Sequence, residues 1–357
     1  MFARTLVVGF ALIGLTVPAA DPLPELQVAK HPHGYVCHRR TKPIEIDGKP
    51  DEAWAAAAWS EEFVDIEGDM KPAPRHKTRM KMLWDDDALY ILAELEDPHV
   101  WATLKEHDSV IYHDNDFEVF LDPDGDNHDY GELELNALNT TWDLLLTKPY
   151  KDSGRAIHNW EIHGLKTGVH VNGTLNDPRD TDRGWTLEIR WPFTGIGELA
   201  KLKLPPKDGD QWRINFSRVQ WEHAVKDGKY VKAKPKEDNW VWSPQGAIDM
   251  HRPERWGYLQ FSTAAPGKTE FSPDADWPTR DLLHRVYYAE RHFFRDKEKY
   301  TADMGALNLG GVAVPLSGAV QIEATKRGFQ ASLERPGERG GKPRRYVINQ
   351  DGRMTKE

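Results

Sequence analysis

The chain has 357 residues, of which 29% are charged, and acidic residues outnumber basic ones to give a formal net charge of -10. Nucleic acids and anionic membranes are also negatively charged, so this balance argues against both as partners. The length is sufficient for two domains, and the single cysteine, Cys37, excludes an internal disulfide.

The first 20 residues have the order of a secretory signal. A basic residue, Arg4, precedes an apolar run from Leu6 to Val17, and the small residues Ala19 and Ala20 follow. The run has about a dozen residues, fewer than the ~20 that span a bilayer. We therefore expect a signal peptide at residues 1–20, a short linker at 21–34, a secreted or periplasmic protein, and no membrane span after the signal is removed.

Residues 79–261 show apolar positions that alternate with polar ones in short runs, broken by Asp, Asn, Gly and Pro. A period of two places one side of each strand in a core and is typical of a β sandwich. The expected strands include a hairpin at 79–96 and runs near 117–121, 133–135, 185–191 and 212–216. We predict that the main domain, residues 35–263, is an all-β antiparallel sandwich.

The opposite sides of these strands are rich in hydrogen-bonding groups. They carry Glu118, Glu132, Glu134, Asn136, Glu188, Arg190, Arg213, Asn215 and Ser217. Such a polar sheet face is able to bind hydroxyl groups. Alternate residues such as Glu132 and Glu134 lie ~7 Å apart along a strand, a separation that also suits the acid and base of a glycoside hydrolase. Hydrolysis of O-glycosyl bonds therefore stays open as an alternative.

Several motifs, in order, resemble those of carbohydrate-binding module family 9. They are Ile46-Asp47-Gly48 with Asp51-Glu52 and Trp54, the hairpin 80–93, the strand 116–122, the run 185–193 and the closing run 256–261. In local terms, Asp47-Gly48 supplies a turn, Asp51 caps a short helical turn and Trp54 packs beneath the sandwich. The resemblance implies an immunoglobulin-like or jelly-roll-like sandwich that binds carbohydrate without cleaving it, works beside polysaccharide-degrading enzymes and uses calcium as a structural ion.

The resemblance also indicates which residues contact sugar. In the family two tryptophans clamp a terminal sugar; Tyr112 stands at the first position and Met250 at the second, and Glu134 replaces an expected arginine. The expected sugar-binding residues are Tyr112, Glu118, Asn136, Trp242, Met250 and Arg252. A structural alternative stays open for the loop at 240–256, in which Trp242 and Trp256 cover the end of the sandwich and either Arg252 or Arg255 pairs with Glu254.

Two further sites follow from local patterns. Asp122, Asp124 and Asp126 place carboxylates at alternating positions in a loop that contains Gly125, and calcium prefers such oxygen ligands. We predict a structural calcium ion there, with a solvated turn as the alternative. Met250 and His251 raise a third possible function, an electron-transfer domain that binds haem, although no second axial ligand is evident.

The pattern changes after residue 263. Residues 264–278 contain many Pro, Ser, Thr, Ala and Asp residues and predict a linker. Apolar residues at helical spacing then predict a helix at 279–300, and two hairpin-like segments follow at 320–333 and 345–354. We expect a small α+β domain at 279–357, for which the sequence indicates no role.

Overall fold

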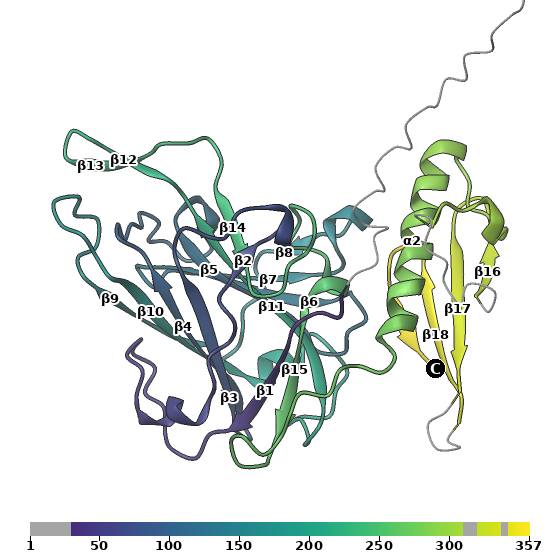
Figure 1. Cartoon of the computed structure of the whole chain (residues 1–357), viewed down its shortest axis with the longest axis horizontal. Coiled ribbons are helices and arrows are strands. Elements are labelled where there is room, and N and C mark those ends of the chain that lie inside the picture. Colours follow the sequence, from purple (N-terminus) through teal and green to yellow (C-terminus); the bar gives the residue numbers. More distant parts are fainter. Residues whose placement is uncertain (1–29, 310–319, 337–341) are drawn as a thin grey trace, which may run out of the picture.

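The computed structural model describes residues 30–309, 320–336 and 342–357 (Figure 1). The expected signal peptide at 1–20 and most of the linker at 21–34 lie outside the described residues. Among the helices that are described, none combines the length and the apolar character needed to cross a membrane.

The main domain is one hydrogen-bonded sheet that curls into a sandwich. Its strands are β1 (Gly34–Arg39), β2 (Val64–Asp65), β3 (Thr78–Trp84), β4 (Ala88–Glu96), β5 (Asp116–Asp122), β6 (Tyr130–Asn136), β7 (Thr141–Leu146), β8 (Ala156–Ile157), β9 (Lys166–Asn172), β10 (Gly184–Pro192), β11 (Gln211–Gln220), β14 (Asp238–Val241) and β15 (Gly257–Ser262). Their order is β8-β7-β6-β5-β11-β15-β1-β3-β4-β10-β9, with β14 pairing with β11 and β2. Two parallel pairings of β1, with β15 and with β3, join the two layers.

The alternating pattern explains the core between the layers. Phe117, Val119 and Leu121 of β5 face Leu187 and Ile189 of β10 within one buried cluster. The predicted hairpin forms as β3 and β4, because the carboxylate of Asp85 accepts hydrogen bonds from the backbone N–H groups of Asp87 and Ala88 in the turn. The predicted β sandwich is therefore confirmed. Outside the curled sheet, β12 (His223–Lys226) and β13 (Lys229–Lys232) form a hairpin, and α1 (Phe193–Ile196) follows β10.

The motif at residues 46–54 is anchored by one buried carboxylate, that of Glu188. Glu188 accepts hydrogen bonds from the backbone of Asp47 and Gly48 and from the indole N–H of Trp54, at 3.1, 2.9 and 2.7 Å. Asp51 caps the short helix Glu52–Ala56, as predicted. Gly48 has φ +80, and a Cβ there would meet the backbone of His170 at 2.4 Å, so glycine is required. Glu188 thus supports the scaffold and lies away from the polar residues of β5 and β6.

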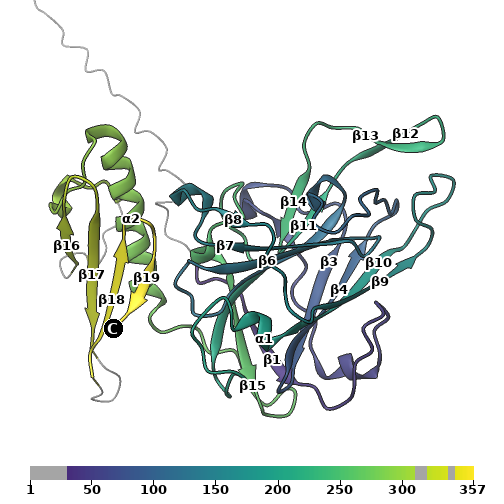
Figure 2. The same ribbon diagram turned by 180° about the vertical axis from the view of Figure 1, so that it is seen from behind.

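The C-terminal part is a helix packed on a small sheet. Helix α2 (Trp277–Lys297) contacts β17 (Phe329–Arg335) and β18 (Arg344–Asn349), which are flanked by β16 (Gln321–Ala324) and β19 (Met354–Lys356). Leu283 and Val286 of the helix share a buried cluster with Leu333, Tyr346 and Ile348. The predicted α+β appendage is confirmed, with a helix that begins two residues earlier than the expected Thr279. Figure 2 shows this unit as a separate lobe beside the sandwich.

The expected linker runs along the sandwich before α2 begins. The backbone N–H of Ser272 donates to Gln260, and the backbone oxygen of Ser272 accepts from Gln211. Phe271 lies so close to Gly34 that an added Cβ would meet its ring at 2.2 Å. The middle of residues 264–278 is therefore held to the sandwich, and the separability of the two units stays a prediction.

Candidate functional site

A cavity of about 470 Å³ lies on the polar side of β5, β6 and β7, opposite the core. Its lining combines rings, apolar side chains and carboxyl groups: Ile66, Tyr112, Glu118, Phe120, Glu132, Glu134, Trp142, Leu144, Tyr150, Val219, Glu237, Asn239, Ile248, Asp249, Met250 and His251. Cavities of 300–1,000 Å³ are typical of sites for small molecules. This cavity is our candidate site.

The strand register assembles the floor of the cavity. Glu118 of β5 pairs directly with Glu134 of β6, and Phe120 pairs with Glu132. On the other side of β6, Glu134 pairs with Trp142 and Glu132 with Leu144 of β7. Because side chains alternate along each strand, the same period that buries Val119 in the core turns these residues to the cavity.

Exposed rings form part of the wall. Tyr112, in the short turn Ile111–His113 before β5, is 39% exposed, and Tyr150, in the loop after β7, is 48% exposed. The ring of Tyr150 packs edge to face against His251 at 4.5 Å. The backbone N–H of Tyr112 donates to the Glu134 carboxylate at 3.0 Å, which holds the turn to the floor. Flat apolar faces of this kind suit the C–H faces of pyranose rings.

Burial strongly perturbs the acidic groups of the floor. Burial raises the pKa of Glu118 to about 7, and the nearby Glu237 carboxylate adds to the shift. Burial and the charge of Glu118 raise the pKa of both Glu132 and Glu134. The charge of Glu132 also contributes to the raised pKa of Glu134. The carboxyl groups of the floor therefore lose their protons at higher pH than ordinary carboxyl groups do.

The structure brings together three of the expected sugar-binding residues, because Tyr112, Glu118 and Met250 line the same cavity. Met250 is buried in a cluster with Phe120 and Trp256, so it forms part of the support and not an exposed platform. Tyr150 supplies the second exposed ring instead. A tryptophan in place of Met250 would overpack this cluster.

The other three expected residues lie outside the cavity and are buried. The amide of Asn136 donates to the backbone of Leu104 and to Asp114, so it secures a loop. Trp242 is fully buried in the main core, and Arg252 donates to the Gln245 carbonyl and pairs with Glu254. The arrangement of Trp242 and Arg252 corresponds to the structural alternative for the loop at 240–256. We leave these two residues and Asn136 out of the candidate site.

Sequence reasoning missed several lining residues, among them Trp142, Tyr150, Glu237 and Ile248. Trp142 and Leu144 alternate in a short strand, a signal that was available. Tyr150 and Ile248 lie in loops, where no period marks a binding residue.

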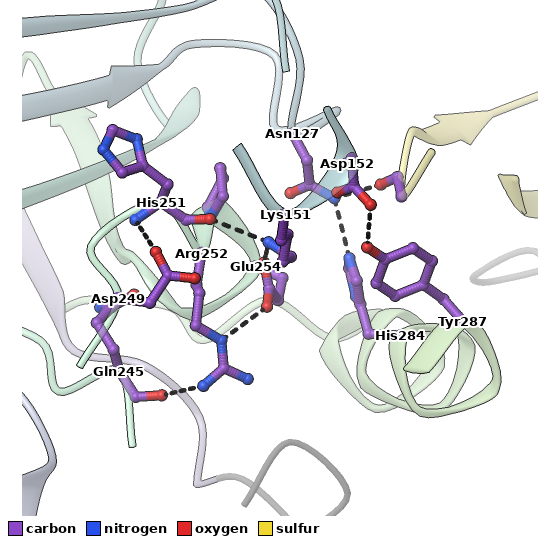
Figure 3. Close-up of polar contacts among 12 residues, drawn as sticks. Asn127, Lys151, Asp152, Gln245, Asp249, His251, Arg252, Glu254, His284 and Tyr287 are labelled. Carbon is purple, nitrogen blue, oxygen red and sulfur yellow. Dashed lines mark hydrogen bonds and ion pairs between the residues drawn. The ribbon is translucent and has the colours of Figure 1, made fainter. Parts of the chain in front are cut away.

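The loop from Gln245 to Trp256 joins the cavity to the C-terminal unit (Figure 3). Its first half lines the cavity through Asp249, Met250 and His251. In its second half Glu254 accepts a hydrogen bond from Tyr288 of α2 and lies 3.7 Å from Lys151. Lys151 also donates to the carbonyl of His251 at 3.0 Å. One buried ion cluster therefore supports both the cavity loop and the docked helix.

The predicted calcium ligands form a cluster in which one oxygen of each of Asp122, Asp124 and Asp126 lies within 4.8 Å of the others. Burial, followed by the charges of Asp124 and Asp126, raises the pKa of Asp122, so a bound cation would favour the ionised form of this group. Part of their bonding capacity is used, because Asp122 accepts from two backbone N–H groups and Asp126 pairs with Arg353. Carboxylates retain lone pairs beyond these bonds, so the donor set fits calcium.

The same loop is a docking point for the C-terminal unit. The amide of Asn127 lies 2.9 Å from the His284 ring of α2 and donates to the Gly352 carbonyl at the same distance (Figure 3). His128 contacts the carbonyl of Asp351 at 2.9 Å. The loop that carries the predicted calcium ligands is therefore one of the contacts between the sandwich and the appendage.

Comparisons with known proteins agree with the fold. A family model described as carbohydrate family 9 binding domain-like matches residues 46–240, more than half of the chain. Two similar solved structures are of a family 9 carbohydrate-binding module from Caldicellulosiruptor kristjanssonii. Its complex with cellotriose is 17% identical, covers 68% of this chain and 100% of that one, and has a TM-score of 0.44. Its complex with glucose is 18% identical, covers 66% and 100%, and has a TM-score of 0.43. A search of curated proteins gave no match.

Proposed function

Because the chain belongs to the carbohydrate family 9 binding domain-like family, we propose that it binds carbohydrate without cleaving it, in the cavity over β5, β6 and β7. The observation that carries this placement is the pair of exposed rings, Tyr112 and Tyr150, beside a floor of hydrogen-bonding carboxyl groups. Rings stack on the C–H faces of a sugar, and carboxyl groups accept from its hydroxyls.

The proposal has three further parts, which concern location, biological role and a bound ion. The protein is secreted or periplasmic, directed by the signal-like residues 1–20. It acts in polysaccharide recognition or breakdown beside degrading enzymes. Calcium at Asp122, Asp124 and Asp126 stabilises the loop on which the appendage docks.

A glycan array followed by product analysis tests the proposal. We expect retention of at least one class of glycan, with the sugar recovered unchanged. Retention by a Tyr112→Ala, Tyr150→Ala double variant at parental strength would place binding elsewhere.

A second candidate function, hydrolysis of O-glycosyl bonds, is favoured by one observation. Glu118, with its pKa raised to about 7, has the protonation that a general acid needs, and Glu134 stands opposite it. Oxygen atoms of the two groups lie within 4.8 Å, close to the ~5 Å separation between carboxyl groups in retaining enzymes. This candidate would be supported if the parent protein gave cleaved products in the same assay and the Glu118→Gln variant gave none. The haem alternative is less compatible, since five carboxyl groups line the cavity beside Met250.

A further inference from the structure

The candidate cavity is strongly acidic. Five of its lining residues are carboxylic acids, Glu118, Glu132, Glu134, Glu237 and Asp249, and no lysine or arginine is among the described residues that line it. Burial lowers the pKa of the one lining histidine, His251, to about 3, so this ring is neutral. Lys151 interacts with Asp249 from behind the loop, which leaves the four glutamates without a basic partner in the lining.

At least one of these carboxyl groups is buried and incompletely bonded. Glu132 is 4% exposed, and its Oε2 atom has no hydrogen-bond partner among the described residues. Below the lining, near Glu118 and Glu134, Asp116 is fully buried, and its Oδ2 atom likewise has no partner within the part of the chain that the structure describes. Buried polar atoms are almost always hydrogen-bonded in native proteins, so an unsatisfied carboxyl oxygen at a cavity points to a ligand that donates.

The spacing of the acidic groups matches an ammonium ion. One oxygen of each of Asp116, Glu118 and Glu134 lies within 4.8 Å of the other two. An ammonium group has three N–H donors and a positive charge, so it can donate to several of these oxygens and neutralise them together. Hydroxyl groups of a neutral sugar donate as well, but they carry no positive charge that would favour the ionised form of these buried carboxyl groups.

We propose that the cavity selects a saccharide unit that bears a protonated amine, such as a glucosamine residue, over neutral sugars. This inference rests on the proposed function, since it names the class of sugar bound at the same site. The ammonium group lies on the floor between Glu118 and Glu134, with Glu132 on the same strand as Glu134, and the sugar ring stacks on Tyr112 and Tyr150.

The walls favour an amino sugar over a bare metal ion. A divalent ion contacts only the oxygen atoms of the floor and gains nothing from the rings and apolar side chains that make up the rest of the lining. An amino sugar uses both parts, because its C–H face packs on the tyrosines while its ammonium group meets the carboxylates.

The test compares three oligosaccharides of equal length that differ only at the C2 substituent. Chitosan oligomers carry an amine, chitin oligomers an acetamide and cello-oligomers a hydroxyl. Titration calorimetry of the full chain at pH 7, with chelator and at constant ionic strength, should show the amine form binding at least about tenfold more tightly than both neutral forms, as expected for hydrogen bonds to a charged group.

Two variants locate the effect. Glu132→Gln removes a buried floor carboxylate, and Glu237→Gln removes a half-buried one whose loss is less demanding for folding. Each should weaken binding of the amine form by a larger factor than binding of cello-oligomers, so that the preference for the amine falls. Glu62→Gln, which removes an exposed charge paired with Lys77 far from the lining, is the matched control and should keep the preference.

The outcomes separate the two claims. If neutral oligomers bind as tightly as the amine form, the inference is overturned and the proposed function stands. If no oligomer binds, the inference is overturned, and the glycan array alone decides the proposed function. If calcium without sugar binds at the floor, depends on Glu132 and Glu237, and the amine gives no advantage, the floor is a metal site and the inference is overturned.

Discussion

Glu118 of β5 stands directly opposite Glu134 of β6 in an antiparallel pair, and both side chains are buried. Like charges at facing positions of a sheet destabilise it, and burial increases the cost. Ionisation of Glu118 and Glu134, together with the nearby Glu132 and Asp116, therefore destabilises the sandwich. A cluster of buried carboxyl groups with perturbed pKa values is typical of a binding site, where such groups contact a ligand and lower the stability of the unliganded fold.

This arrangement predicts a pH dependence of stability. The pKa of Glu118 is about 7 in the folded chain, against an ordinary value of 4.5. The folded state thus binds its proton more tightly than the unfolded state. The stabilisation is fully present below pH 4.5 and is lost as the pH rises through about 7. Four other carboxyl groups interact electrostatically within this cluster around Glu118. They are those of Asp116, Glu132, Glu134 and Glu237, and they titrate together with Glu118 as the pH rises.

Glu118→Gln should therefore raise the melting temperature at pH 8 and have much less effect at pH 4. The gain is on the order of 3 kcal/mol, which is the free energy that corresponds to the difference between a pKa of about 7 and the ordinary 4.5. Thermal melts of parent and variant across this range measure it, with Glu62→Gln as the control for a lost surface charge. Equal melting temperatures of parent and Glu118→Gln at pH 8 would contradict the account.

Calcium should stabilise the folded chain through Asp122, Asp124 and Asp126. Binding to the folded state alone adds about 2.7 kcal/mol at a hundredfold excess over Kd. A chelator should lower the melting temperature of the parent but not that of Asp124→Asn, whose side chain is exposed. Identical melts with and without chelator would argue against the ion.

The buried Glu254 should support both the C-terminal helix and the cavity. Although burial raises its pKa, the charges of Lys151 and Arg252 outweigh this effect and hold the pKa below its ordinary value. Glu254→Ala leaves these two cations without their partner, a change that typically costs about 3–5 kcal/mol. We expect a lower melting temperature and faster proteolysis near residues 264–270.

Sugar affinity should also fall in Glu254→Ala, although Glu254 does not line the cavity, because Lys151 holds the carbonyl of His251. Arg295→Ala on the exposed surface of the same helix is the control. Unchanged affinity together with a lowered melting temperature would show that the loop keeps its shape without this ion cluster.

Much of the fold follows from local patterns in the sequence. The period of two in Phe117, Val119 and Leu121 predicts both the strand and its buried side, and Asp51 and Trp54 have the roles that their motif indicates. These features depend on neighbours a few residues away or on the alternation of side chains, which the sequence displays directly.

The rest depends on pairings between distant segments. Tyr150 approaches the cavity only because β7 pairs with β6, and the docking of α2 depends on Asn127 meeting His284 across 157 positions of sequence. Trp242 illustrates a further limit: a tryptophan in an aromatic-rich loop suits a platform or a core equally well, and only packing decides between them.

The central claim is that sugar binds at Tyr112 and Tyr150, and calorimetry with the best glycan from the array tests it most directly. Each of Tyr112→Ala and Tyr150→Ala should weaken binding by about 1 kcal/mol, roughly fivefold to tenfold, with an unchanged melting temperature. Phe294→Ala, which removes a ring of 38% exposure from α2, should bind like the parent. Parental affinity in both tyrosine variants would contradict the account.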